Sequence, residues 1–242
     1  MYKNLSAVIL AGGFGTRVKN QLRDVPKPMA PVAGRPFLEW VIRYLRNQGI
    51  AQFVLSTGYR AEVIEDYFKV HQIPDTEIVC VPENRPLGTA GGFLNAVAKS
   101  GLNSSQWLVA NGDSLALAKL NDFFTIINNE LISAAILALS VEDSTRYGTL
   151  EVTASGRLME FTEKRQGLGL INAGLYLFKS EALKLFPAVR PLSFETEVFP
   201  HLLFKSVPIA VNSVSAPFLD IGTPQSLVQA DGFIESNRDY FL

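Results

Sequence analysis

The stretch that decides the fold lies near the start of the chain and reads Leu5-Ser6-Ala7-Val8-Ile9-Leu10-Ala11-Gly12-Gly13-Phe14-Gly15-Thr16-Arg17. Its apolar part predicts a buried strand, and the abrupt change to glycine predicts a tight loop where that strand ends. Glycines let the backbone pass close to a ligand and turn its N–H groups inward, as a phosphate group or the edge of a base requires. Thr16 adds a hydroxyl donor, and Arg17 adds a planar cation that suits phosphate oxygens. The glycines alone fit a solvent-exposed turn equally well.

Two well-known phosphate-binding motifs do not fit this loop. When the dinucleotide fingerprint is counted from Gly13 and Gly15, Val18 stands where its third glycine belongs. A Walker loop needs the string G-x-x-x-x-G-K-[ST], which follows neither Gly12 nor Gly13. The sequence therefore predicts a phosphate site of another kind and excludes a dinucleotide-dependent dehydrogenase.

The composition limits the class of protein. The chain has 242 residues, 48% hydrophobic and 19% charged, as expected for one globular domain of α/β size. Its net charge of −1 gives no overall attraction to nucleic acid or to an anionic membrane, so we expect neither as a partner. The chain lacks the pattern of a signal peptide and any apolar stretch long enough to span a bilayer. The single cysteine, Cys80, excludes an intramolecular disulfide and is interpreted as buried filler. We therefore expect a cytoplasmic protein.

Strand and helix patterns alternate along the first part of the chain. The predicted helices cover residues 37–48, 61–68 and about 89–99, and the predicted strands cover residues 52–56, 77–81 and 106–111. This alternation predicts an α/β fold with a Rossmann-like, doubly wound and mostly parallel sheet, which binds ligands at the carboxyl ends of its strands.

Further strands are predicted at residues 133–141, 149–152, 158–161 and 171–178, followed by a helix from Pro224 to about Asn237. We interpret residues 1–242 as a single domain, in which residues 131–242 form an acceptor-binding half on the same sheet as residues 1–130. The apolar residues Phe233 and Ile234 and the closing Tyr240-Phe241-Leu242 fit either a homodimer contact or packing onto the same chain.

Several loops carry residues suited to chemistry. Lys27 stands between Pro26 and Pro28, which predicts a stiff, extended segment. The glycine-rich loop 82–92 opens a helix whose N–H groups are expected to face an anion. Asp113 follows a predicted strand, where it fits metal or phosphate chemistry as well as a helix cap. Asp220 lies between apolar residues, which favours a metal or cation partner, whereas the helix cap falls on the neighbouring Thr223.

Taken in order, these motifs resemble those of the sugar-1-phosphate nucleotidyltransferases. The matching motifs are Leu10-Ala11-Gly12-Gly13-Phe14-Gly15-Thr16-Arg17, Pro26-Lys27-Pro28-Met29, Pro86-Leu87-Gly88-Thr89-Ala90, Asn111-Gly112-Asp113, Glu163-Lys164, Asn172-Ala173-Gly174 and Asp220-Ile221-Gly222-Thr223. Each motif alone is weak, but the ordered set is specific and covers nearly the whole chain. Within the family, the short length and the run Asp24-Val25-Pro26-Lys27-Pro28-Met29-Ala30-Pro31 are most similar to the D-glycero-α-D-manno-heptose 1-phosphate guanylyltransferases.

The resemblance implies a reaction in which a sugar 1-phosphate attacks the α-phosphorus of a nucleoside triphosphate, expected to be GTP. The products are a nucleotide-sugar for surface polysaccharide assembly and pyrophosphate. The attacking phosphate oxygen is already an anion, so no general base is needed, which suits a chain whose two histidines, His71 and His201, lie outside every motif. Positioning and charge neutralisation therefore carry the catalysis.

The resemblance implies a nucleotide-binding half at 1–130 and a sugar-phosphate-binding half at 131–242. It also implies roles for individual residues. Arg17 and Lys27 would hold the triphosphate, and Lys164 would bind the sugar phosphate. Asp113 and Asp220 would hold Mg²⁺, which prefers oxygen ligands. Sugar hydroxyl groups would be bound by Glu163, Asn172, the Gly174 backbone and Glu195, the last of which also fits a helix-start charge. The expected nucleotide contacts are Leu10, Ala11, Gly12, Gly13, Gly15, Thr16, Glu83, Pro86, Gly88, Thr89, Asn111 and Gly112.

The choice of base is expected to depend on Glu83. A carboxylate at Glu83 would accept hydrogen bonds from both N1–H and N2–H₂ of guanine, although a solvated loop acid fits the sequence equally well. Mannose 1-phosphate as acceptor, and dTTP, CTP or UTP as donor, remain alternatives. A non-catalytic sensor of nucleotide-sugars is a further alternative, which the retention of Arg17, Lys27, Asp113, Lys164 and Asp220 disfavours.

Overall fold

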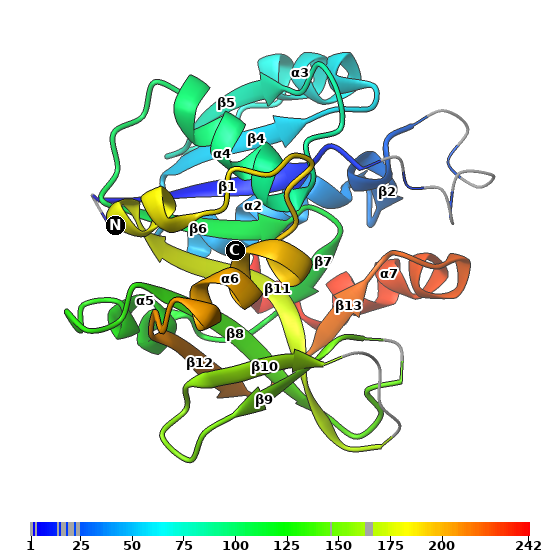
Figure 1. The fold of residues 1–242 in the computed structure, drawn as a ribbon. Coiled ribbons are helices and arrows are strands. Elements are labelled where there is room, and N and C mark those ends of the chain that lie inside the picture. The colour runs from blue at the N-terminus through cyan, green and yellow to red at the C-terminus, as the bar shows by residue number, and fades with distance from the viewer. Residues whose placement is uncertain are drawn as a thin grey trace.

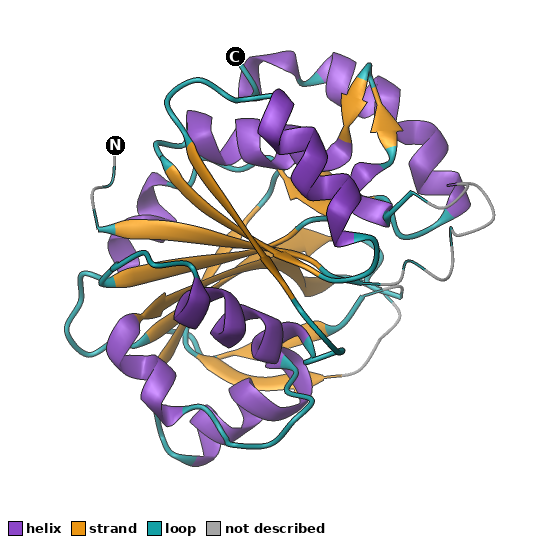
Figure 2. Ribbon diagram, turned by 90° about the horizontal axis from the view of Figure 1, so that it is seen from above, coloured by secondary structure: helices purple, strands orange, loops and turns teal. Residues whose placement is uncertain are grey.

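The computed structural model describes residues 2, 4–13, 15, 18, 22, 25–145, 147–162 and 167–242. A nine-stranded mixed sheet runs through the molecule, and helices cover both of its faces (Figures 1 and 2). The predicted fold class is thereby confirmed.

The first half of the chain forms the parallel part of the sheet. Strand β1 (Leu5–Ala11) lies between β4 (Gln52–Thr57) and β6 (Gln106–Asn111) and is parallel to both, and β5 (Glu77–Pro82) pairs with β4 at the sheet edge. In this register Leu10 is paired with both Ser56 and Asn111. The loops that follow these strands therefore emerge at the same end of the sheet, the carboxyl end of its parallel strands, where polar side chains from distant segments meet.

Two apolar clusters fill the space between the sheet and its helices. Successive side chains of β1 point to opposite faces, so Ile9 joins the cluster under α2 (Phe37–Asn47) and Val8 joins the cluster under α4 (Thr89–Lys99). Helix α2 has apolar residues at helical spacing and ends before Gly49, which has a φ of +93°. Helices α3 (Ala61–Val70) and α5 (Asn121–Ile126) also belong to this half.

The second half extends the same sheet, mainly with antiparallel strands. The long strand β11 (Gly169–Lys179) pairs with β6 on one side and with β8 (Ala134–Val141) on the other, and its register against β8 shifts between Asn172 and Tyr176. Such a bulge bends a strand and redirects its side chains. The other elements are β9 (Thr149–Val152), β10 (Leu158–Thr162), β12 (Ile209–Val214), α6 (Phe199–Phe204) and the π-helical turn η3 (Phe194–Val198), with short 3₁₀ turns at η2 (Ser180–Leu185) and η4 (Arg238–Tyr240).

The end of the chain packs onto its own core. Helix α7 (Pro224–Ser236) begins at Thr223, whose hydroxyl accepts a hydrogen bond from the Ser226 N–H, so the predicted cap is confirmed. Ile234 and Phe241 are buried, and the Phe241 ring contacts Trp40 edge-on with ring centres 5.2 Å apart. Packing onto the same chain therefore accounts for the apolar residues of this segment other than Leu242, which is exposed.

Two further expectations concern the burial of Cys80 and the absence of membrane-spanning segments. Cys80 is half-buried on β5, and burial raises the pKa of its thiol to about 11, so the thiol remains protonated and fits the interpretation as filler. Within the described ranges, no helix has both the length and the apolar character needed to cross a membrane.

Candidate functional site

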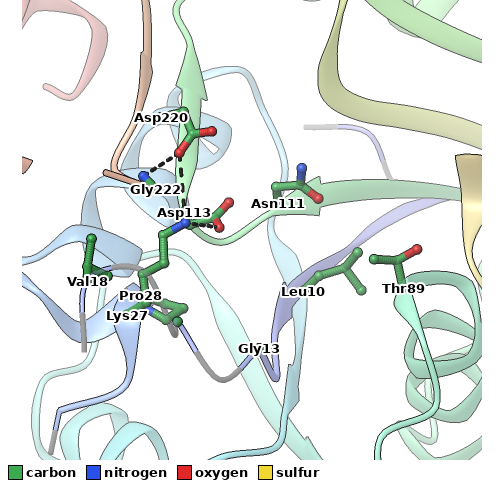
Figure 3. Close-up of a pocket in the computed structure, with 11 residues that line it drawn as sticks. Leu10, Gly13, Val18, Lys27, Pro28, Thr89, Asn111, Asp113, Asp220 and Gly222 are labelled. Carbon is green, nitrogen blue, oxygen red and sulfur yellow. Dashed lines mark hydrogen bonds and ion pairs between the residues drawn. The ribbon is translucent and has the colours of Figure 1, made fainter. Parts of the chain in front are cut away.

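A cavity of about 460 Å³ opens at the carboxyl end of the parallel strands, where β1 and β6 end (Figure 3). Its walls come from segments far apart in the sequence, as is usual where parallel strands end. The lining residues are Leu10, Gly13, Gly15, Val18, Lys27, Pro28, Thr89, Asn111, Asp113, Asp220 and Gly222. Eight of these are predicted site residues. The other three were not predicted as contacts, although Pro28 and Gly222 belong to the quoted motifs and Val18 directly follows one.

Lys27 stands at the start of a short 3₁₀ turn, η1 (Lys27–Met29), so the predicted extended conformation is wrong. The turn closes through hydrogen bonds from the Met29 N–H to the Pro26 carbonyl, at 2.7 Å, and from the Ala30 N–H to the Lys27 carbonyl, at 3.0 Å. Proline is compatible with the first turn of a helix, where its missing N–H is not needed. The two prolines therefore fix a tight turn, which directs the lysine side chain into the cavity (Figure 3).

Both predicted metal carboxylates face the Lys27 ammonium group. Lys27 Nζ lies 2.6 Å from Asp113 Oδ2 and 3.8 Å from Asp220 Oδ1, and the lysine side chain is only 14% exposed (Figure 3). The Gly222 N–H also donates to Asp220 Oδ1. A Cβ atom at Gly222 would lie 3.1 Å from Lys27 Nζ and closer still to Asp220, so the close approach requires glycine.

A small antiparallel sheet explains how residues 113 and 220 meet. Strand β7 (Ser114–Ala116) pairs with β13 (Phe218–Asp220), with Ser114 opposite Asp220, and the Ile221 N–H donates to the Asp113 carbonyl at 3.0 Å. Because Asp113 is followed by a strand and not by a helix, the interpretation as a helix cap is excluded.

The first glycine loop packs closely against its neighbours. Gly15 has a φ of +56°, and a Cβ atom there would lie 2.9 Å from Lys27 Cβ. A Cβ atom at Gly12 would lie 3.2 Å from a carboxylate oxygen of Glu83, and Gly112 donates its N–H to the Leu10 carbonyl at 2.9 Å. Thr16 and Arg17, the predicted polar contacts of this loop, lie outside the described residues.

The start of α4 differs from the expectation. The N–H groups of Ala90 and Gly91 both donate to the Leu192 carbonyl, at 2.9 and 3.0 Å, and that of Gly92 donates to Gly88. These N–H groups therefore do not face an anion, and the prediction for the helix start is wrong at these three positions. The cause is a segment one hundred residues away in the sequence that returns to cap the helix. Thr89 remains in the cavity wall.

Glu83 lies outside the cavity lining, beneath the two glycine loops. Its Oε1 atom accepts a hydrogen bond from the Ser56 hydroxyl at 3.1 Å, and its Oε2 atom accepts one from the Leu87 N–H at 3.1 Å. A carboxylate has about four acceptor sites, so two remain for another donor. Ala11, Gly12, Pro86, Gly88 and Gly112 also lie outside the lining.

A second cavity, of about 550 Å³, lies among the antiparallel strands. It is lined by Tyr147, Gly148, Phe161, Thr162, Asn172, Glu195 and Thr196. Asn172 and Glu195 are predicted sugar contacts, whereas the other five belong to no motif and left no signal in the sequence. Glu163 and Lys164 lie outside the described residues, directly after Thr162 in the chain. Gly174 has a φ of +73° and packs against the side chain of Asn111, so it adjoins the first cavity.

The oxygen atoms of Asp113 and Asp220 suit a hard cation such as Mg²⁺. Among the described residues, no group of three or more His, Cys, Asp and Glu side chains could hold a metal ion. The two carboxylates therefore fit a divalent ion only if further ligands come from water or from a bound phosphate, which is the usual arrangement for Mg²⁺.

Known proteins share both the sequence pattern and the fold. The family described as nucleotidyl transferase matches residues 6–237. The D-glycero-alpha-D-manno-heptose 1-phosphate guanylyltransferase of Campylobacter jejuni is 36% identical over 225 residues, which are 91% of this chain and 96% of that protein. The mannose-1-phosphate guanylyltransferase of Mycobacterium tuberculosis is 33% identical over 228 residues, which are 93% of this chain and 63% of that protein.

A solved structure supports the same grouping. The crystal structure of HddC from Yersinia pseudotuberculosis, complexed with GMP-PN, superposes on this chain with a TM-score of 0.83 at 32% identity, and the match covers 94% of this chain and 98% of that one. The family inferred from the ordered motifs is therefore confirmed, and the chain belongs to the nucleotidyl transferase family.

Proposed function

We propose that this protein transfers a guanylyl group from GTP to D-glycero-α-D-manno-heptose 1-phosphate, giving GDP-heptose and pyrophosphate. The observation that carries the proposal is the cluster of Lys27, Asp113 and Asp220 at the edge of a cavity built by the two glycine loops. The 36% identity to a heptose 1-phosphate guanylyltransferase over almost the full length of both chains supports the choice of substrates.

The nucleotide would lie in the first cavity. Lys27 supplies a cation that neutralises triphosphate oxygens and stabilises the charge that develops on the leaving pyrophosphate. Arg17 is proposed to act with it from the glycine loop. Gly13 and Gly15 leave room for the phosphate chain. Leu10, Thr89 and Asn111 line the side of the cavity away from Lys27 (Figure 3).

Asp113 and Asp220 are the residues that would hold Mg²⁺. An ion held by these carboxylates would supply charge neutralisation at the α-phosphate. Before nucleotide binds, the Lys27 ammonium group compensates both carboxylates at 2.6 and 3.8 Å. When the triphosphate enters, Lys27 can turn to the phosphate oxygens because its flexible stem allows the charge to move while the turn at residues 27–29 stays fixed.

The acceptor sugar would lie in the second cavity, with its phosphate directed toward the first. Lys164 is proposed to bind that phosphate and Glu163 a sugar hydroxyl group. Asn172 and Glu195 offer hydrogen bonds to further hydroxyl groups from the cavity wall. The acceptor phosphate oxygen attacks the α-phosphorus directly, and pyrophosphate leaves with its negative charge stabilised by the cations. No proton transfer is needed.

The discriminating experiment measures pyrophosphate release in Mg²⁺ buffer with GTP, ATP, CTP, UTP and dTTP, each against D-glycero-α-D-manno-heptose 1-phosphate and mannose 1-phosphate. We expect the highest kcat/KM for GTP with the heptose. Preference for mannose 1-phosphate would favour the second candidate, a mannose-1-phosphate guanylyltransferase, for which the 33% identity to the mycobacterial enzyme is the supporting observation. Preference for another base would overturn the guanylyl assignment but retain the reaction class.

A further inference from the structure

Tyr176 is a buried polar residue that the mechanism above does not use. It lies on β11 directly after the bulge, with 1% of its surface exposed. Its ring packs against Phe194 and Phe199, with ring centres 5.0 and 5.1 Å away. Burial of a hydroxyl group among aromatic rings is costly unless the hydroxyl is hydrogen-bonded. The partners of this hydroxyl therefore indicate why a tyrosine stands here in place of a phenylalanine.

Both partners belong to the wall of the second cavity. The Tyr176 hydroxyl donates to Glu195 Oε1 at 2.8 Å and accepts from Asn172 Nδ2 at 2.6 Å. Asn172 and Glu195 line the cavity, whereas Tyr176 lies behind them. Burial raises the pKa of Tyr176 well above its ordinary value, so the hydroxyl keeps its proton and remains a donor to the carboxylate.

The hydrogen bonds give Asn172 a single orientation. The Gly174 N–H donates to Asn172 Oδ1 at 2.9 Å, which directs the amide nitrogen toward Tyr176. One hydrogen of that nitrogen is used by the tyrosine, and the second stays available to a ligand. A flipped amide would place two N–H groups against each other at Gly174, so the donor side of Asn172 is fixed.

Glu195 is held in the same way from two sides. While Tyr176 binds Oε1, the Ser193 hydroxyl donates to Oε2 at 2.9 Å, and the Thr89 hydroxyl lies 3.5 Å from the same atom. The start of η3 is capped by other groups: Ser193 accepts from two backbone N–H groups, and Glu197 accepts from the Ser193 N–H at 2.6 Å. Glu195 is therefore not needed as a helix-start charge.

We propose that Tyr176 is a positioning residue, whose hydroxyl holds Asn172 as a donor and Glu195 as an acceptor toward the hydroxyl groups of the acceptor sugar. The inference rests on the proposed function, because it assigns the second cavity to the sugar. A sugar hydroxyl both donates and accepts, so a fixed donor beside a fixed acceptor is complementary to it. The same network adjoins the nucleotide cavity at Thr89 and, through Gly174, at Asn111.

The test is Tyr176→Phe, which keeps the ring and removes the hydroxyl. Tyr44→Phe is the matched control, because Tyr44 is equally buried and its hydroxyl donates at 2.8 Å to the Ala118 carbonyl, away from the second cavity. Both variants should lower the melting temperature. Only Tyr176→Phe should raise KM for the sugar 1-phosphate, by about tenfold, the size expected when hydrogen bonds to a charged group are weakened. KM for GTP should stay within about twofold in both.

A double mutant distinguishes an effect of the Tyr176 hydroxyl through Glu195 from a general loss of protein stability. If the hydroxyl acts through Glu195, adding Tyr176→Phe to Glu195→Ala should change KM for the sugar far less than it does in the unaltered protein. Equal KM values for Tyr176→Phe and Tyr44→Phe in an active enzyme would overturn this inference alone. Calorimetric titration of sugar 1-phosphate, with a non-hydrolysable GTP analogue bound, gives a second readout. If the unaltered protein binds no sugar 1-phosphate in this titration, both the inference and the proposed function fail.

Discussion

Lys27 Nζ lies 2.6 Å from Asp113 Oδ2, although 86 positions separate the two residues in the chain. The turn at residues 27–29 places one partner, and the end of β6 places the other. Asp220 completes the group from a third segment, at 3.8 Å from the same nitrogen. Among the residues that the structure describes, two carboxylates share one partly buried ammonium group, an arrangement that suits a second cation.

Asp113→Asn should lower kcat/KM for nucleotidyl transfer by about 10²–10³-fold, the loss typical when one preorganised charge-stabilising group is removed. The amide keeps the shape of the side chain but cannot neutralise Lys27 or bind a metal as strongly. Asp66→Asn is the control, because Asp66 is also paired with a lysine, Lys69, at 3.0 Å but on the exposed surface of α3. The measurement is pyrophosphate release at saturating Mg²⁺. Equal activity of both variants would contradict the assigned role of Asp113.

Lys27→Met should lower turnover and at the same time strengthen the binding of a divalent ion in the absence of nucleotide. The ammonium group compensates both carboxylates, so its removal takes away a positive charge that competes with a divalent ion for them. Titration calorimetry with Mn²⁺ compares the unaltered protein with Lys27→Met and with Lys69→Met as the surface control. An unchanged Mn²⁺ affinity in Lys27→Met would show that Asp113 and Asp220 do not act on one cation.

The extent to which the sequence predicted this site differs from residue to residue. Strand β1, helix α2 and the position of Asp113 after a buried strand follow from local apolar patterns and from the rules of parallel sheets. The short antiparallel strand that ends at Asp220 was not predicted. The cap that Leu192 places on α4 does not, because it depends on where a distant segment returns. No local pattern encodes such a contact.

Two other features show the same limit. The prolines beside Lys27 predicted an extended segment, but a fixed proline φ is compatible with a 3₁₀ turn as well as with an extended chain. Tyr176 has the pattern of a core strand residue, and only the bulge in β11 brings its hydroxyl to Asn172 and Glu195. Residues of this kind acquire their role from tertiary contacts.

Glu83→Gln should weaken the use of GTP and relax the choice of base, because one oxygen that can accept from guanine becomes an N–H₂ donor. We expect the ratio of kcat/KM for GTP to that for dTTP to fall by about tenfold, the loss expected for one hydrogen bond to a charged group. Ser56→Ala is the control, since it removes the hydrogen bond to Glu83 Oε1 but keeps the carboxylate. An unchanged base preference in Glu83→Gln would assign Glu83 to the support of the Leu87 loop.

Glu39 should make the free energy of unfolding depend on pH. Its side chain is 2% exposed, and burial alone would raise its pKa, but hydrogen bonds from Tyr67 and Arg43 and the charges of Arg43 and Arg35 outweigh burial and lower the pKa below 4.5. The folded state therefore binds the proton less tightly than the unfolded state, so this contribution is complete above about pH 4.5 and is lost as the pH falls through the lower, folded value. Urea unfolding between pH 3 and 7 should show a smaller acid-side decrease for Glu39→Gln. An identical pH profile would contradict the prediction.

Two glycines should respond to alanine in opposite directions. Gly88 has a φ of +81°, and a Cβ atom there would collide with the Leu192 backbone, whereas Gly232 lies within α7 with nothing inside 4 Å of an added Cβ. Gly88→Ala should therefore lower the free energy of unfolding by at least about 1–3 kcal/mol, the cost of such a backbone conformation in other residues. Gly232→Ala should raise it by about 0.5–1 kcal/mol, because alanine loses less backbone entropy in a helix. Urea denaturation measures both changes. Since Leu192 also caps the start of α4, equal stability of Gly88→Ala and the unaltered protein would show that residues 88 and 192 are not in contact.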